Sequence, residues 1–278
     1  MSGPAAVALH ARISEETPRD LRGVDLLAEL AGERFGVPVE SIEGRQGPFG
    51  RTGWEDDLAA SRDPLIRAGS VLDRELSAGR RPVTLASDCS LALGTLPALA
   101  EARPGAQVLW LDAHCDYDTP VTTSIGFLGC MSLAGATGAW DAGLGRTALA
   151  PERVVLCGVR GSLDDFDGAG RRAVEGSPVR MVSPGPGAAE AVVAALGTAP
   201  VYVHLDPDVL DPTDNPVPYA RPGGLGIEQL LDLLRAVRDR GPVVGLELTA
   251  FHTDDDPARR RAVAERLVQC LERLAGPV

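Results

Sequence analysis

The sequence predicts an α/β protein whose strands form a doubly wound, mostly parallel sheet. Two observations support this. Short apolar runs alternate with helix-like segments along the whole chain, and the runs are almost continuously apolar, as in strands that are covered on both faces. The chain has 278 residues, of which 44% are hydrophobic and 24% charged. That length and balance suit one large globular domain, which we expect to span residues 1–278.

The expected elements follow one another in regular order. Val- and Leu-rich runs of strand length predict strands over residues 5–10, 82–87, 107–112, 153–159, 200–206 and 242–248. The longer segments between them predict helices over residues 18–35, 56–79, 91–102, 187–197, 226–240 and 257–274. Pro- and Gly-rich stretches at 41–53 and 211–224 are expected to be loops. The second is long, and long loops beside strand ends often carry function.

Composition excludes several classes of protein. The formal net charge is −12, and all 27 basic residues are arginines spread along the chain. A nucleic-acid or membrane-surface binder needs a basic patch, so we expect neither partner. No apolar stretch reaches transmembrane length and no signal-peptide pattern opens the chain. The five cysteines form no disulfide framework, which predicts reduced thiols and a cytoplasmic location.

Chemistry-bearing residues gather where four of the expected strands end. In open α/β sheets, ligands bind outside the carboxyl ends of the strands, so these ends predict the functional site. The residues concerned are Asp88 and Cys89 after the second expected strand, Asp112, His114 and Asp116 after the third, Asp206 and Asp208 after the fifth, and Glu247 near the end of the last.

The spacing of these residues predicts a metal site. Alternate side chains of extended backbone point to one side, so Asp112, His114 and Asp116 can share a pocket, as can Asp206 and Asp208. Clustered carboxylates repel one another unless cations neutralise them. Two divalent ions would do so, and would lower the pKa of a shared water enough to give a hydroxide for hydrolysis.

Other interpretations of the same residues stay open at this point. An aspartate at a strand end can also cap a helix or form a turn. A Cys–His nucleophilic pair could form from Cys89 and His114, although neighbouring acids would raise the pKa of the thiol.

The motifs resemble the arginase–agmatinase (ureohydrolase) family. The family patterns G-G-D-H-S, D-A-H-x-D, S-x-D-x-D-x-x-D-P and a late E-x-N-P correspond here to residues 86–90, 112–116, 204–212 and 247–250. They occur in the family's order across most of the chain. The resemblance implies a three-layer α/β/α fold around an eight-stranded, mostly parallel sheet. It also implies two divalent ions, most commonly Mn²⁺, and hydrolysis of a guanidine-type C–N bond in a small molecule, and it leaves a homo-oligomer open.

Carried over by position, the resemblance assigns roles to individual residues. One ion would be held by Cys89, Asp112, Asp116 and Asp206, and the other by His114, Asp112, Asp206 and Asp208. Glu247 would bind the cationic guanidinium group, a pairing that suits a carboxylate and a planar cation. Asp116 or a chain of solvent would move the proton.

Departures from the family pattern concern the substrate. Cys89 replaces a histidine ligand, and Gly129 stands where many arginases have a proton-shuttling histidine, for which His252 is a candidate substitute. Asp118 and Ile125 stand where the family grips an α-carboxylate, and an acid there would repel one. The cysteine and the segment after it resemble a smaller branch of the family, with hydroxyarginine-hydrolysing members in antibiotic biosynthesis.

The sequence therefore predicts a hydrolase acting on linear amidines, with an N-omega-hydroxy-L-arginine-like substrate that yields hydroxyurea or urea plus an amine. A decarboxylated, agmatine-like substrate is one alternative, and a non-catalytic metal-binding relative is another.

Overall fold

A computed structural model describes residues 3–215, 217, 219–252 and 256–275. All eight strands of the described chain form one sheet in the order β2-β1-β3-β8-β7-β4-β5-β6, and every neighbouring pair is parallel. The strands are β1 (Pro4–His10), β2 (Val39–Glu43), β3 (Arg81–Ala86), β4 (Gln107–Leu111), β5 (Val154–Cys157), β6 (Arg180–Val182), β7 (Val201–Leu205) and β8 (Val243–Leu248). This confirms the predicted α/β class and the eight-stranded parallel sheet.

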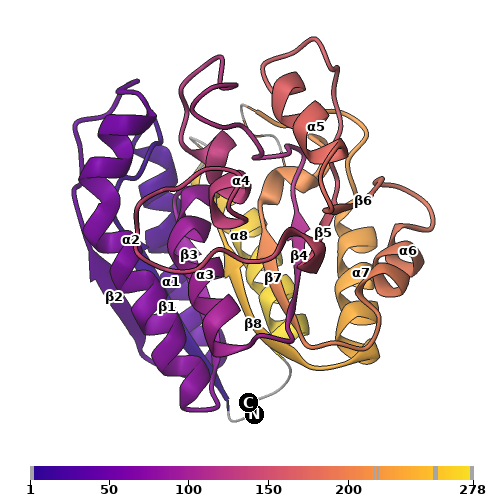
Figure 1. Cartoon of the computed structure of the whole chain (residues 1–278). Helices are drawn as coiled ribbons and strands as arrows, with labels where there is room; N and C mark the ends of the chain where they lie inside the picture. The colour runs from indigo at the N-terminus through magenta and orange to yellow at the C-terminus, as the bar shows by residue number, and fades with distance from the viewer. Residues whose placement is uncertain (1–2, 216, 218, 253–255, 276–278) are drawn as a thin grey trace.

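Helices cover both faces of the sheet, giving three layers (Figure 1). One face packs against α1 (Arg19–Phe35), α6 (Ala188–Leu196), α7 (Ile227–Arg240) and α8 (Pro257–Ala275). The other packs against α2 (Trp54–Ser77), α3 (Ala92–Ala102), α4 (Ser132–Ala136) and α5 (Gly168–Glu175). Side chains of β4 alternate between the two faces of the sheet. Leu109 and Leu111 pack into the core on the α1 side, and Val108 and Trp110 pack into the core on the α3 side.

The elements that the sequence analysis missed are short or lie at the edges of the sheet. The last three residues of β2 fall in the expected loop at 41–53, and β6 was not predicted. Only one of the five residues of β2 is buried, and β6 has three residues, all half-buried. Neither strand presents the continuous apolar run by which the central strands were recognised.

Two glycines bring α3 close to α2. A Cβ atom on Gly94 would lie 2.2 Å from the main-chain oxygen of Leu65, and one on Gly69 would lie 2.5 Å from the oxygen of Gly94. Only glycine permits such close backbone contact. The close packing fixes α3 at the carboxyl end of β3, where the thiol of Cys89 lies.

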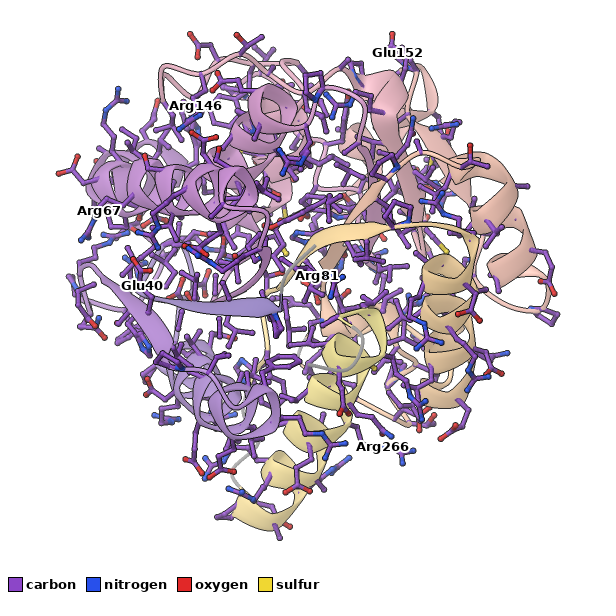
Figure 2. The ribbon with its side chains drawn as sticks, turned by 90° about the horizontal axis from the view of Figure 1, so that it is seen from below. Glu40, Arg67, Arg81, Arg146, Glu152 and Arg266 are labelled. Carbon is purple, nitrogen blue, oxygen red and sulfur yellow. The ribbon has the colours of Figure 1, made fainter. Side chains whose placement is uncertain are left out.

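Charged side chains surround the end of the sheet at which the strands begin, opposite to the carboxyl ends (Figure 2). In this view Arg81, the first residue of β3, lies near the centre, and its Nε donates to the main-chain oxygen of Val243 at 3.0 Å. The other labelled side chains lie around the margin: Glu40, Arg67, Arg146, Glu152 and Arg266. The clustered acids of the predicted site therefore lie apart from this ordinary charged periphery.

Candidate metal centre and its cavity

Short turns at the strand ends fix the predicted ligands. The 3₁₀ turn η1 (Cys89–Leu91) follows β3 and is capped by Asp88, whose Oδ1 accepts from the Ser90 amide at 2.7 Å. The turn η4 (Pro207–Val209) follows β7 and is capped by Asp206, whose Oδ1 accepts from the Asp208 amide at 2.8 Å. Side-chain caps of this kind hold both the capping carboxylate and the first residues of the turn.

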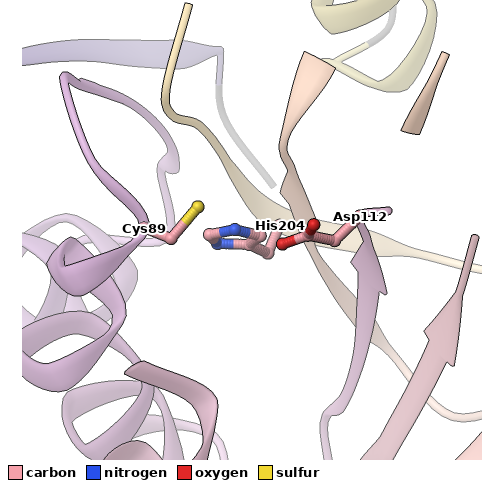
Figure 3. A group of neighbouring side chains, drawn as sticks. All are labelled: Cys89, Asp112 and His204. Carbon is pink, nitrogen blue, oxygen red and sulfur yellow. The ribbon is translucent and has the colours of Figure 1, made fainter. Parts of the chain in front are cut away.

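Two groups of buried side chains could each hold a metal ion. In one, Cys89, Asp112 and His204 place ligand atoms within 4.8 Å of one another; in the other, Asp112, His114 and Asp208 do so. Figure 3 shows the first group, with the Cys89 thiol and the Asp112 carboxylate on either side of the His204 ring. Because Asp112 belongs to both groups, one carboxylate can bridge two ions.

Hydrogen bonds orient these ligands. The Asp112 carboxylate accepts from Trp110 Nε1 at 3.0 Å and from the His114 amide at 2.7 Å. Asp208 accepts from the Ala113 amide at 2.9 Å, and its other oxygen lies 2.8 Å from His114 Nδ1. The thiol of Cys89 lies 3.2 Å from Asp206 Oδ2, so Asp206 adjoins the first group.

The electrostatics of the site favour bound cations. Burial and the nearby Asp208 raise the pKa of both Asp112 and Asp206. Burial also raises the pKa of the Cys89 thiol, and Asp206 adds to that rise, which disfavours a thiolate nucleophile in the metal-free protein. Burial opposes ionisation of Asp208 as well, but the neighbouring His114 lowers its pKa. For His114, burial acts to lower the pKa, but Asp208 and Asp112 outweigh it and raise the pKa.

The donor set fits divalent metal ions. Several carboxylates, an imidazole and a thiol converge with too little positive charge to balance them, and His114 Nε2 is buried without a hydrogen-bond partner. Bound cations would neutralise the acids and reverse the pKa shifts. Carboxylate and imidazole donors suit Mn²⁺, whereas a thiolate shifts preference towards softer ions.

The role expected for Glu247, binding of the guanidinium group, stays a prediction. Its side chain is completely buried, and it is absent from the cavity lining. Its carboxylate accepts from Thr95 Oγ1 at 2.7 Å and Tyr202 OH at 2.9 Å, and lies 2.7 Å from His204 Nδ1. Both oxygens are bonded beneath the ligands, so this carboxylate also orients the His204 ring.

His204 is the candidate ligand that the sequence analysis did not assign. Its ring stacks on Trp110 with the centroids 3.5 Å apart, and its Nε2 lies 3.4 Å from Thr249 Oγ1. Metal-binding histidines commonly donate their second ring nitrogen to a carboxylate, which is the arrangement of His204 with Glu247. The signal was available, since His204 stands two residues before Asp206 in a strand and so shares its face.

A cavity of about 430 Å³ opens above the ligands. Of the predicted residues, Cys89, His114, Asp116, Asp206, Asp208 and Gly129 line it. Asp118 does not: it is fully buried, with Oδ1 accepting from Thr122 Oγ1 at 3.1 Å. The expectation that Asp118 binds substrate stays a prediction, and its side chain is not among those that line the cavity.

Asp116 and Gly129, which both line the cavity, have unusual local geometry: Asp116 in its backbone and Gly129 in its packing. Asp116 has a φ of 48°, rare for a residue with a side chain, and its Oδ2 accepts from Ser132 Oγ at 3.2 Å. Burial and Asp112 raise its pKa well above the usual range. A Cβ on Gly129 would lie 2.5 Å from the Phe127 ring, so this position leaves no room for a larger side chain beside the ring as it stands.

Loops remote in sequence complete the cavity, and the sequence analysis missed most of them. The residues concerned include Glu15 and Glu16 from the loop after β1, Asp20 from the first turn of α1, Arg51 from the loop after β2, Phe166, and Tyr219 from the long loop at 211–224, of which Pro216 and Pro218 lie outside the described residues. His252 also lines the cavity, with Nδ1 3.0 Å from Asp20 Oδ1. Loops have no periodicity from which such convergence could be inferred.

Comparisons with known proteins agree on one family. The model of the arginase family matches residues 55–272. The chain is 32% identical to the N(omega)-hydroxy-L-arginine amidinohydrolase of Streptomyces lavendulae, over 96% of this chain and 93% of that one. It is 33% identical to the proclavaminate amidinohydrolase of Streptomyces clavuligerus, over 63% of this chain and 56% of that one.

Solved structures show the same fold. The arginase of Bacillus caldovelox superimposes with a TM-score of 0.83 and 22% identity, covering 100% of this chain and 99% of that one. Among the described residues, no helix is long and apolar enough to cross a membrane.

Proposed function

The chain belongs to the arginase family, and from that premise we propose that it hydrolyses the guanidine C–N bond of N-omega-hydroxy-L-arginine or a closely related modified guanidine. It is a hydrolase that acts on guanidino groups. The observation that carries the proposal is the pair of ligand groups that share Asp112 beside a cavity of about 430 Å³. Antibiotic biosynthesis is the setting that fits such a substrate.

The family depends on a binuclear metal centre, and we propose Mn²⁺ as its metal here. The first ion would be held by Cys89, Asp112, Asp116 and Asp206, with His204 Nε2 available beside them. The second would be held by His114, Asp112, Asp206 and Asp208. Bound there, the ions supply a nucleophile from water at neutral pH and neutralise charge that develops on the reacting carbon's substituents.

The chain's own residues would position the reaction and handle its proton. Asp208 and the Ala113 amide hold the orientation of His114 and of the loop after β4. Asp116 lines the cavity beside the proposed ligands, so it is placed to accept a proton from the attacking water and pass it to the leaving amine. The Phe127 and Phe166 rings exclude bulk water from the same wall.

The cavity rim is compatible with an amino-acid end. Arg51 pairs with Glu16 at 2.8 Å, and His252 pairs with Asp20 at 3.0 Å, so both signs of charge border the entrance. Asp118 was the reason to expect a decarboxylated substrate, and it lies outside the cavity. An α-carboxylate therefore meets no acid at that position.

A substrate panel tests the proposal. Purified protein loaded with Mn²⁺, Co²⁺, Zn²⁺ or Fe²⁺ is assayed with hydroxyarginine, arginine, agmatine and guanidinobutyrate, and urea, hydroxyurea and amine release are measured. We expect the highest kcat/KM with hydroxyarginine. A preference for agmatine would replace this substrate by the decarboxylated class, and no turnover of any guanidine with any metal would favour a non-catalytic protein.

We further propose that residues 1–278 form one ureohydrolase-like domain that works in the cytoplasm. All five cysteines are free and buried, as suits reduced thiols. Size-exclusion chromatography with light scattering would show whether the active form is a monomer or a homo-oligomer.

A further inference from the structure

The cavity has an apolar wall, and part of this wall adjoins the metal ligands. Its large apolar side chains come from loops that are separate in the sequence: Ile125, Phe127, Phe166, Val217 and Tyr219. Phe166 is half-buried and lies next to a proposed ligand, since its ring centroid is 5.5 Å from that of His114. A substrate whose guanidino group lies at the ligands therefore has the Phe166 ring beside the atoms that follow that group.

Arg221 supports the Phe166 ring. Its guanidinium carbon lies 5.1 Å from the ring centroid, a distance at which a cation and an aromatic ring attract each other. The guanidinium is fixed in turn by an ion pair with Asp165, the residue before Phe166. Only 14% of the Arg221 side chain is exposed, so solvent screens these contacts little. The ring thus rests on a charged group that does not itself line the cavity.

Arg160 and Arg221 fasten two loops to each other. Arg221 Nη1 donates to the main-chain oxygen of Arg160 at 3.0 Å, and Arg160 Nε donates to that of Arg221 at 2.8 Å. Arg160 Nη2 also donates to the main-chain oxygen of Asp208 at 2.7 Å. Gly161 has a φ of 112°, and a Cβ there would lie 1.5 Å from Arg221 Nη1, so both the backbone and the close contact favour glycine. The loop that carries Phe166 is thereby fixed relative to a proposed metal ligand.

We propose that Phe166 selects the substrate by its aliphatic stem: the ring packs against the methylene groups next to the reacting guanidino group, and Arg221 keeps the ring in place. The proposal rests on the proposed function, because it names the residue that recognises the part of that substrate beyond the guanidino group. Apolar contact weakens steeply as atoms separate, so the position of the ring decides how much binding it contributes. A guanidine with an aliphatic substituent gains from this contact, whereas a bare guanidine does not.

A series of n-alkylguanidines from methyl to butyl measures the stem contact directly. Each is tested as a competitive inhibitor of full-length, metal-loaded protein, with guanidinium ion as the member that has no stem. In wild type, each methylene that packs on the ring should lower the inhibition constant about three- to fourfold. Phe166→Ala should remove most of this dependence and leave guanidinium inhibition and metal content as in wild type. Its KM for hydroxyarginine should rise roughly 10–100-fold with kcat little changed.

Leu163→Ala is the matched control. Leu163 is an exposed apolar residue of the same loop and does not line the cavity. Its truncation should leave KM and the dependence on chain length within about twofold of wild type. Phe166→Leu, which keeps apolar bulk at the wall, should recover part of the loss seen in Phe166→Ala.

Arg221→Gln tests whether the guanidinium positions the ring. It removes the cation beside Phe166 and the ion pair with Asp165, so we expect KM for hydroxyarginine to rise about two- to fivefold and the dependence on chain length to weaken. Guanidinium inhibition should stay unchanged, which separates positioning of the ring from general damage to the site. Because Arg221 acts through Phe166, the double variant should bind no worse than Phe166→Ala alone.

Three results would overturn the proposal: an unchanged dependence on chain length in Phe166→Ala, equal weakening of guanidinium and butylguanidine, or an equal effect of Leu163→Ala. Additive losses in the double variant would overturn the role of Arg221. Failure of the proposed function is a different outcome, in which wild-type protein turns over no guanidine. Calorimetric titration of metal-loaded wild type and Phe166→Ala with the same alkylguanidines would still test Phe166 in that case, because binding needs no turnover.

Discussion

Two adjacent rows of buried polar side chains lie near the carboxyl ends of the strands. They differ in whether the protein itself compensates their buried charges. We call Cys89, Asp112, His114, Asp206 and Asp208 the metal layer. One step below, the lower row crosses four paired strands and consists of Thr84, Glu247, His204 and Trp110.

Acids in the lower row are neutralised within the protein, whereas those in the metal layer are not. The Glu247 carboxylate has partners on α3, β7 and the His204 ring. In the metal layer, Asp112 and Asp206 face other acids, and their pKa values are raised by burial and by Asp208. A buried acid is thus a candidate for function when the fold leaves its charge uncompensated, and a structural element when the fold compensates it.

The largest expected effect comes from removing the carboxylate shared by both ligand groups. Asp112→Asn should lose both metal ions and lower kcat/KM by roughly 10³-fold or more, since each lost cation removes several kcal/mol of charge stabilisation. His114→Ala, which belongs to one group, should lose one ion. Elemental analysis of dialysed protein measures both. Asp118→Asn is the control, and retention of two ions by Asp112→Asn would contradict a shared ligand.

The lower row should affect the metals without touching the substrate. Glu247→Gln keeps the side-chain shape but weakens the hydrogen bond to His204. Changes in residues that hydrogen-bond a metal ligand typically cost 10–100-fold in metal affinity or activity. We expect the metal dissociation constant to rise by about that factor, with KM for the guanidine unchanged at saturating metal. A raised KM for Glu247→Gln at saturating metal would support its predicted role as the guanidinium acceptor.

Replacing the thiol should change metal preference more than total activity. Cys89→His exchanges a soft, anionic ligand for a neutral imidazole, so preference for Mn²⁺ over Zn²⁺ should rise on the order of tenfold. Competition between the two ions, followed by elemental analysis, gives the ratio. Cys270→Ala, in the remote core on α8, should leave the ratio unchanged. An identical shift in that control would indicate a nonspecific effect.

Local periodicity is sufficient to predict most of the metal layer. The D-x-H-x-D and D-x-D spacings place alternate residues on one side of extended backbone, and the six central strands are recognisable by their apolar runs. The same rule applied to β7 would have placed His204 on the face of Asp206, where the structure has it.

The level of a residue relative to residues on neighbouring strands could not be predicted in this way. Glu247 ends an apolar run just as Asp112 follows one, but the register pairs Glu247 with His204 and Thr84, one step below Asp206. Register between strands depends on packing across the whole sheet and is not a local property. Glu15 and Asp118 lie in irregular segments, where only the folded loop decides which side chain enters the cavity.

The smallest expected effect is the pH dependence of stability in metal-free protein. Asp112, Asp116 and Asp206 have raised pKa values when folded, so the folded state binds more protons than the unfolded one. Stability is then greatest below the unfolded pKa of about 4 and falls as pH rises through the folded values. The raised pKa of His114 acts in the same direction above pH 6.5, whereas the lowered pKa of Asp208 matters only in acid below about pH 4.

Melting of chelated protein should therefore fall by several degrees between pH 5.5 and 8, since one pKa unit is about 1.4 kcal/mol and ~1 kcal/mol moves Tm by about 2–4 °C at this size. Added Mn²⁺ should reverse the slope, because it binds the deprotonated ligands and only the folded state holds them together. Asp112→Asn combined with Asp206→Asn should reduce the metal-free slope, while Glu247→Gln should leave it as in wild type. Equal slopes in both variants would mean that the two rows do not differ in the way their charges are compensated.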